Sequence, residues 1–150
     1  MSTDFDTTAE TAGDVFAAQS ATRSRRLWRL GTIAAAVLLA TAVWALAVPI
    51  AGLELAVGTG PSTQVIGPDG VAVSSLLLGL AAWALLVLLE KLGERGRRFW
   101  QAAGWIVLVL SLAGPIAMGG APAVLLTLLA MHLVVGVTVI LGLAHPRAGA

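Results

Sequence analysis

The chain has 150 residues, enough for one compact unit, of which 58% are hydrophobic and only 11% are charged. Soluble domains usually carry about 25% charged residues, so a water-soluble fold would have too little polar surface to cover this apolar material. The net charge of +1 indicates no class of partner, and we expect no nucleic-acid partner. The lack of cysteine excludes disulfides and cysteine-based metal sites, and with only two histidines, His132 and His145, we expect no metal and no cofactor.

Residues 1–22 form a polar, acidic tail that cannot bury enough apolar surface to offset its ordering entropy, which predicts disorder. Its acidity also argues against a secretory signal peptide, which would begin with a basic region. A basic collar follows, made of Arg23, Arg25, Arg26 and Arg29, with Trp28 among them. Such a collar is typical of a membrane interface, where arginines contact the phosphates of anionic lipid headgroups.

Four apolar runs follow, at about 30–50, 71–89, 100–118 and 123–143. A helix needs roughly 20 residues to cross about 30 Å of hydrocarbon, and backbone in lipid must satisfy its own hydrogen bonds. The sequence therefore predicts an all-α integral membrane protein, a four-transmembrane-helix bundle of two antiparallel hairpins, as a single membrane domain over 23–147.

Proline and glycine punctuate the spans and the segments between them. Pro49 can stop or kink the first span, and Gly114-Pro115 breaks the outer half of the third. The outer loop, 51–70, contains two stretches with strand character, Leu53 to Val57 and Thr63 to Ile66, separated by a glycine-rich turn. This pattern predicts either a short β-hairpin at the membrane surface or an irregular loop. A charged loop at 90–99 and a tight turn at 119–122 complete the connections.

The orientation follows from counting lysine and arginine on each side of the membrane. The N-terminal flank holds four, the 90–99 loop holds four and the C-terminal flank holds one, whereas the loops at 51–70 and 119–122 hold none. We therefore expect a multi-pass protein with both termini in the cytoplasm. The preference for arginine over lysine and the heavy use of Ala, Gly, Val and Leu are typical of a GC-rich bacterial genome, which makes the bacterial inner membrane the expected location.

His132 is the first candidate functional residue because it lies near the middle of the fourth span, where an ionisable group is costly. Gly136, one turn further on, would let another helix approach closely. Ser111 and Thr41 fall at a similar depth in the third and first spans, so a central polar cluster is geometrically possible. It could be a proton relay or a ligand site, or the histidine could be neutral and hydrogen-bond across the bundle. We favour the second interpretation, because a histidine without an acidic partner in any span is a poor proton pathway, and because serine and threonine often bond back to their own helix.

Glu54 is the second candidate, just beyond the first span at the outer interface. It could bind a cation or pair with a basic residue of a partner, or it could be a solvated loop carboxylate. Asp69 is expected to cap the start of the second span, near the positive end of the helix dipole.

Five tryptophans and one pair of small residues bear on packing. We expect Trp28 and Trp100 at the cytoplasmic interface, and the other three tryptophans (Trp44, Trp83 and Trp105) within the bundle. Ser75 and Gly79 form a small-xxx-small pair that favours helix packing.

Several segments together resemble a family of bacterial membrane proteins. They are AVWALAV in the first span, LELAVG and TQVIG in the outer loop, AAWALLVLLE before the basic loop, LSLAGP in the third span and MHLVVGVTVILGL in the fourth. From about Leu30 to Leu143 the chain resembles a family of four-span proteins, mostly actinobacterial, classed as a domain of unknown function. The resemblance implies a fold and a location but no activity.

No nucleotide loop, catalytic triad or paired intramembrane carboxylate occurs in the sequence. We therefore expect a non-enzymatic structural or accessory component of the membrane that associates with itself or with another membrane protein. The alternative is a small transporter or proton-coupled carrier that uses His132. A lipid-modifying enzyme with His132 or Glu54 as base ranks last, because no nucleophile or metal set supports it.

Overall fold

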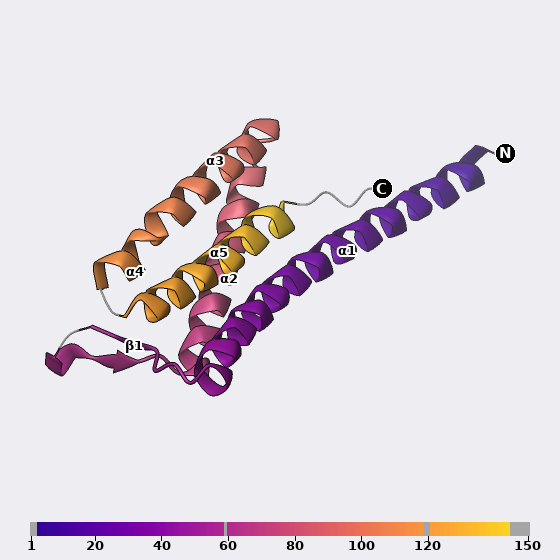
Figure 1. Ribbon diagram of the computed structural model, residues 1–150. Helices are drawn as coiled ribbons and strands as arrows, with labels where there is room; N and C mark the ends of the chain where they lie inside the picture. Colours follow the sequence, from indigo (N-terminus) through magenta and orange to yellow (C-terminus); the bar gives the residue numbers. More distant parts are fainter. Residues whose placement is uncertain (1–2, 59, 119–120, 145–150) are drawn as a thin grey trace.

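The computed structural model describes residues 3–58, 60–118 and 121–144, and these form a bundle of helices with one small β-hairpin at its side (Figure 1). Four helical segments within these ranges are long and apolar enough to cross a membrane: Ala18–Ile50, Pro68–Glu90, Glu94–Met118 and Pro122–Leu143. The four-span, all-α prediction is therefore confirmed. Part of the turn expected at 119–122, together with His145 and Arg147, lies outside the described residues.

Helix α1 (Thr3–Ala45) is much longer than the first predicted span. It continues back through the tail that we expected to be disordered, so that prediction differs from the structure, and Phe16 on this extension is 70% exposed. Extending a helix that is already nucleated costs little per residue, and acidic side chains favour the positive end of its dipole. The tail therefore needs no core of its own to be helical. Figure 1 shows α1 projecting well past the rest of the bundle.

Pro49 changes the helix type rather than simply ending it. Residues Leu46–Ile50 form a π-helical turn, η1, with Pro49 inside it. Because proline has no N–H and its ring collides with the carbonyl four residues earlier, the tighter α-helical pattern cannot be kept here. The wider turn closes with a 3.0 Å bond from Ala51 N to Leu46 O, and Gly52 then reverses the chain with a φ of 68°.

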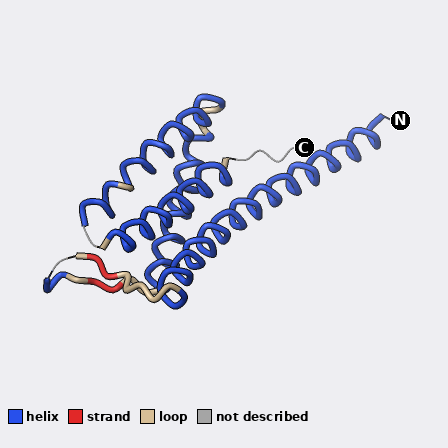
Figure 2. Tube along the Cα trace, viewed as in Figure 1, coloured by secondary structure: helices blue, strands red, loops and turns tan. Residues whose placement is uncertain are grey.

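The outer loop contains the short hairpin that was one of its two predicted conformations. Strands β1 (Ala56–Val57) and β2 (Gln64–Val65) pair in antiparallel register, with Ala56 opposite Val65. A 3₁₀ turn, η2 (Gly60–Ser62), lies between them, and Figure 2 shows the strands as the only red segments beside the blue helices. Leu55, just before β1, is 1% exposed, so the loop is anchored in the core at its base.

Helices α2 (Pro68–Glu90) and α3 (Glu94–Ser111) form a tight helical hairpin. The sequence placed a loop at 90–99, but the connection is only residues 91–93, and the basic residues that follow it already lie on α3. Two glycines allow this. Gly93 has a φ of 63°, and a Cβ on Gly96 would lie 1.8 Å from the carbonyl oxygen of Leu89. The backbone of α3 therefore starts closer to α2 than any other residue type would permit.

The third span is interrupted as Gly114-Pro115 predicted. Helix α3 ends at Ser111, Leu112 forms a turn, and α4 (Ala113–Met118) completes the span. Proline lacks the N–H that a continuous helix would need at this position. Helix α5 (Pro122–Leu143) begins with a proline at its first position, where the missing N–H costs nothing.

Glycines and alanines set the distances between the helices. Ala36 and Ala40 on α1 are at most 1% exposed. The side chain of Ile33 on α1 lies over Gly79 of α2, 2.9 Å from where a Cβ would be, as the Ser75–Gly79 pair predicted. On the other flank, the side chain of Thr32 lies similarly close to the place where a Cβ on Gly142 of α5 would be. Helix α1 therefore packs along both α2 and α5, and α3 covers the opposite side of these two helices.

Candidate functional site

His132 is on α5 and is half-buried. Its Nδ1 lies 2.8 Å from the backbone oxygen of Leu128, one turn earlier on the same helix. A carbonyl oxygen can only accept, so Nδ1 carries the hydrogen of this bond. The expected hydrogen bond across the bundle is not formed among the described residues, because Nδ1 is engaged by a carbonyl of its own helix and Nε2 has no partner there.

A cavity of about 270 Å³ lies between α2, α3 and α5, and we call it the α3 cavity. Its polar side chains are Trp100, Ser111 and His132, and the remaining lining is apolar. Ala81 and Val107 at its edge are exposed residues, so the cavity opens on the outer side of the bundle. In a membrane this opening faces lipid.

A second cavity of about 290 Å³ lies between α1, α2 and α5 under Ile66 of the outer loop, and we call it the α1 cavity. His132 lines this one too, together with Ser74 and Ser75 of α2. Ser74 bonds back to the carbonyl of Gly70 at 2.7 Å. Ser75 is 7% exposed and makes no hydrogen bond with any residue that the structure describes.

His132 therefore lies in the wall that the two cavities share. Leu78 of α2 and Val135 of α5 are the other two residues that line both. The α1 cavity extends from this point towards the outer loop, and the α3 cavity extends towards Trp100, near the start of α3. This arrangement is the feature that sets His132 apart from a histidine enclosed in a core.

The predicted polar cluster of His132, Ser111 and Thr41 is only half assembled. Ser111 lines the α3 cavity with His132, whereas Thr41 lines neither cavity. Each hydroxyl donates to its own helix, Ser111 to the oxygen of Leu108 at 2.7 Å and Thr41 to that of Val37 at 2.8 Å. Gly136 has the predicted role, because Leu108 of α3 lies 2.5 Å from where its Cβ would be.

The two outer acidic residues are apart from this site. Glu54 is exposed in the loop after η1, and no described group forms an ion pair with it. Asp69 lies in the first turn of α2, near the positive end of the helix dipole, but the N-cap position belongs to Gly67. Pro68 takes the first helical position, so the cap lies two residues earlier than a capping Asp69 would place it.

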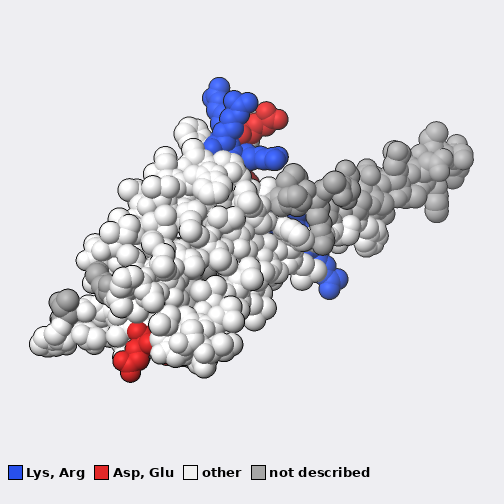
Figure 3. Space-filling model, in the orientation of Figure 1, with Lys and Arg blue, Asp and Glu red and all other residues white. Residues whose placement is uncertain are grey.

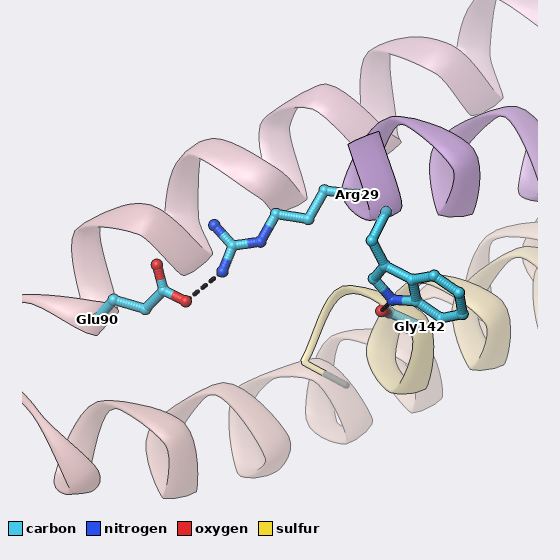
Figure 4. A network of polar contacts seen from close by, with 4 residues as sticks. Arg29, Glu90 and Gly142 are labelled. Carbon is cyan, nitrogen blue, oxygen red and sulfur yellow. Dashed lines mark hydrogen bonds and ion pairs between the residues drawn. The ribbon is translucent and has the colours of Figure 1, made fainter. Parts of the chain in front are cut away.

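Tryptophans make the most distinctive polar contacts, and sequence reasoning missed them. Trp28 of α1 donates from Nε1 to the oxygen of Gly142 at 2.8 Å (Figure 4), and Trp100 of α3 donates to the oxygen of Ile140 at 3.1 Å. Trp100 is 3% exposed, because the close approach of α3 at Gly96 and Gly104 carries its ring inside the bundle. Its depth at the cytoplasmic interface stays a prediction. Trp44 donates to Ile66 O at 2.9 Å and holds the outer loop.

The other two predicted bundle tryptophans differ from each other. The Nε1 of Trp83 is buried and is the one buried side-chain nitrogen or oxygen without a partner among the described residues. Trp105 is 42% exposed, on the outer face of α3. Trp105 therefore does not pack within this bundle, because the interior position on α3 is taken by Trp100 and Leu108.

Charged residues meet at the end of the bundle that holds the 91–93 connection, which we call the basic end. Arg29 of α1 pairs there with Glu90 of α2, at side-chain exposures of 13% and 47% (Figure 4). A cavity of about 330 Å³ surrounds this pair, and Arg25 and Arg97 also line it. The pairing was not predicted, because the sequence places both residues at one end of the bundle but does not give their distance.

A known protein family covers most of the chain. Residues 20–149 match the model of a family of unknown function, DUF6069. The chain therefore belongs to this family, in accord with the resemblance seen in its motifs. No curated protein and no solved structure matches the chain.

Proposed function

We propose that this protein is a non-enzymatic structural or accessory component of the bacterial cell membrane, which acts by associating with another membrane protein or with further copies of itself. The observation that carries the proposal is that the polar side chains of the spans make their hydrogen bonds to backbone carbonyls of the bundle itself. Thr41, Ser111 and His132 each bond to a carbonyl of their own helix, and three tryptophans bond to carbonyls of neighbouring segments. These groups stabilise the bundle and leave few free to act on a substrate.

The proposed orientation has both termini in the cytoplasm. Figure 3 shows basic side chains, with an acidic group beside them, at the end that holds the 91–93 connection, further basic side chains on α1 nearby, and another acidic group at the opposite end by the hairpin. The basic residues of α1 and α3 belong to the first end, and Glu54 and Asp69 to the other. The positive-inside rule relates such an asymmetry to a cytoplasmic basic end.

The basic end also supports the expected contact with anionic lipid headgroups. Arg23, Arg25 and Arg26 are exposed on α1, just before the uncharged part of the helix that begins at Leu30. Basic residues at this level attract anionic lipid by about 1 kcal/mol each. We propose that they set the depth and the tilt at which α1 enters the bilayer.

Native mass spectrometry of the tagged protein, gently solubilised from its own membrane, tests the proposed association. We expect either a different membrane protein in stoichiometric amount or a defined homo-oligomer. A monomer with no bound protein, at the concentrations found in cells, would contradict the proposal. So would solute movement by the purified protein alone in liposomes.

A second candidate, a carrier centred on His132, is favoured by one observation: the histidine lines cavities that extend towards the two ends of the bundle. Proteoliposomes loaded with a pH-sensitive dye, with a potassium gradient and valinomycin to drive protons, test this candidate. A carrier predicts faster acidification with the unaltered protein than with His132→Phe. Thr41→Val, at a residue that lines neither cavity, is the matched control. Equal rates for all three proteins would remove His132 from any proton pathway.

A further inference from the structure

The α3 cavity has an unusual balance of hydrogen-bond donors and acceptors. Its three polar side chains all use their donor hydrogens within the protein. Trp100 Nε1 donates to Ile140 O at 3.1 Å, Ser111 Oγ to Leu108 O at 2.7 Å, and His132 Nδ1 to Leu128 O at 2.8 Å. None of these side chains makes a further hydrogen bond with the described part of the chain.

The polar atoms that these side chains still offer to an occupant of the cavity can only accept hydrogen bonds. Because Nδ1 of His132 carries a hydrogen, Nε2 of the neutral ring presents a lone pair. Nε2 is not among the buried atoms without a partner, so it keeps accessible surface, on a ring that lines this cavity. The oxygen of Ser111 also keeps acceptor capacity beside it. An acceptor without a donor is costly in a medium that contains almost no water.

The rest of the cavity selects for apolar material. Leu85, Val107 and Val139 are among its lining residues, and its opening lies on the face that meets lipid. Its volume of about 270 Å³ is just below the range of roughly 300–1,000 Å³ of typical ligand cavities. This space suits a ring or a short head with its tail extending into the bilayer, and is too small for a whole phospholipid.

We propose that the α3 cavity binds a membrane-soluble molecule with a hydroxyl group, of the phenol or lipid-alcohol class, whose hydroxyl donates to Nε2 of His132. The molecule enters sideways from the lipid between α2 and α3. This ligand site goes beyond the proposed association with other proteins and requires no transport. The α1 cavity would not select in the same way, because the uncommitted hydroxyl of Ser75 can act there as donor or acceptor.

A matched pair of photoreactive probes tests the proposal on the unaltered protein in phosphatidylcholine nanodiscs. One probe is a 4-alkylphenol with a diazirine in the chain. The other is the same molecule with fluorine in place of the hydroxyl, which is similar in size but cannot donate. Peptide mass spectrometry locates the labelled residues. We expect the phenol to label residues around the α3 cavity about tenfold more than the fluoride, the ratio for one hydrogen bond to a desolvated acceptor.

Three variants distinguish the contribution of the hydrogen bond to labelling from the contribution of the cavity space. His132→Phe keeps a ring but removes the acceptor, and should reduce phenol labelling to the fluoride level. Ala103→Leu extends a lining residue into the cavity and should reduce labelling by both probes. Thr41→Val should change neither. Equal labelling by the two probes, undiminished phenol labelling of His132→Phe, or no labelling at the cavity by either probe would each overturn the proposal.

Discussion

At the scale of single residues, two tryptophans complete the end of α5. A helix leaves its last four carbonyls without intrahelical donors, and α5 ends at Leu143. The indoles of Trp28 and Trp100 donate to two of these carbonyls, those of Gly142 and Ile140. Since one tryptophan comes from α1 and the other from α3, the same two bonds tie three helices together at the basic end.

Trp100→Phe should therefore destabilise the bundle. The change leaves the carbonyl of Ile140 without its donor in a buried place, which costs roughly 1–3 kcal/mol. We expect a lower midpoint of thermal unfolding in detergent, measured by circular dichroism. Trp105→Phe is the matched control on the same helix, because Trp105 is 42% exposed and makes no hydrogen bond with the described residues. Equal midpoints for the two variants would show that the indole–carbonyl bond contributes nothing to stability.

Gly96→Ala should disrupt the α2–α3 hairpin. The added Cβ would lie 1.8 Å from the oxygen of Leu89, a backbone atom that cannot rotate away, so the two helix ends must separate. We expect reduced expression and a lower unfolding midpoint. Gly114→Ala is the control, because a Cβ there meets nothing within 4 Å, and alanine in a helix is favoured by about 1 kcal/mol over glycine. A Gly96→Ala protein as stable as the control would contradict this account of the turn.

At the scale of the elements, the sequence was sufficient to predict the four helices and the break at Gly114-Pro115, and it limited the outer loop to a short hairpin or an irregular loop. Hydrophobic length, proline and glycine determine these features locally. The helix starts were less predictable: α3 begins at Glu94 rather than near 100, and α1 extends back to Thr3. Charged residues outside the hydrocarbon are as compatible with helix as with loop, so composition gives the limits of a span and not those of its helix.

The candidate site was less predictable than the helices. Depth along the spans correctly placed His132 and Ser111 at one level, but depth does not show which side chains face each other. Thr41 is at that level too and lines neither cavity. The cavities depend on how α2, α3 and α5 are spaced, and this spacing is set by pairs such as Gly136 with Leu108 on different helices. A single sequence contains both residues without indicating that they touch.

Gly136→Ala tests this spacing. Its Cβ would lie 2.5 Å from Cδ1 of Leu108, which is 5% exposed and cannot easily turn away. Overpacking of this kind costs typically about 1–3 kcal/mol. We expect Leu108→Val to relieve part of the cost, so that the double variant unfolds at a higher temperature than the sum of the two single effects predicts. Gly31→Ala, where a Cβ meets nothing within 4 Å, should be close to neutral. Strict additivity of the two changes would show that α3 does not depend on this contact.

At the scale of the whole molecule, the distribution of charge is the strongest asymmetry. The described lysine and arginine residues lie on α1 and around the start of α3, and the outer hairpin has none. The Arg29–Glu90 pair joins α1 and α2 within this basic end. Because Glu90 is about half exposed, the pair adds at most about 1 kcal/mol to stability. We therefore expect the charges to act mainly on the orientation of the bundle, while the helix contacts hold it together.

The proposed orientation can be tested directly, because the chain has no cysteine and any introduced thiol is unique. Gln64→Cys places an exposed thiol on the outer hairpin, and Leu92→Cys places one in the 91–93 connection without changing a charge. In intact cells, a membrane-impermeant maleimide should label position 64 and leave position 92 unlabelled until the membrane is permeabilised. The reverse pattern would place the termini outside. Equal labelling of both positions before permeabilisation would mean that the chain inserts in two orientations, and the one-sided distribution of arginine would then not determine its topology.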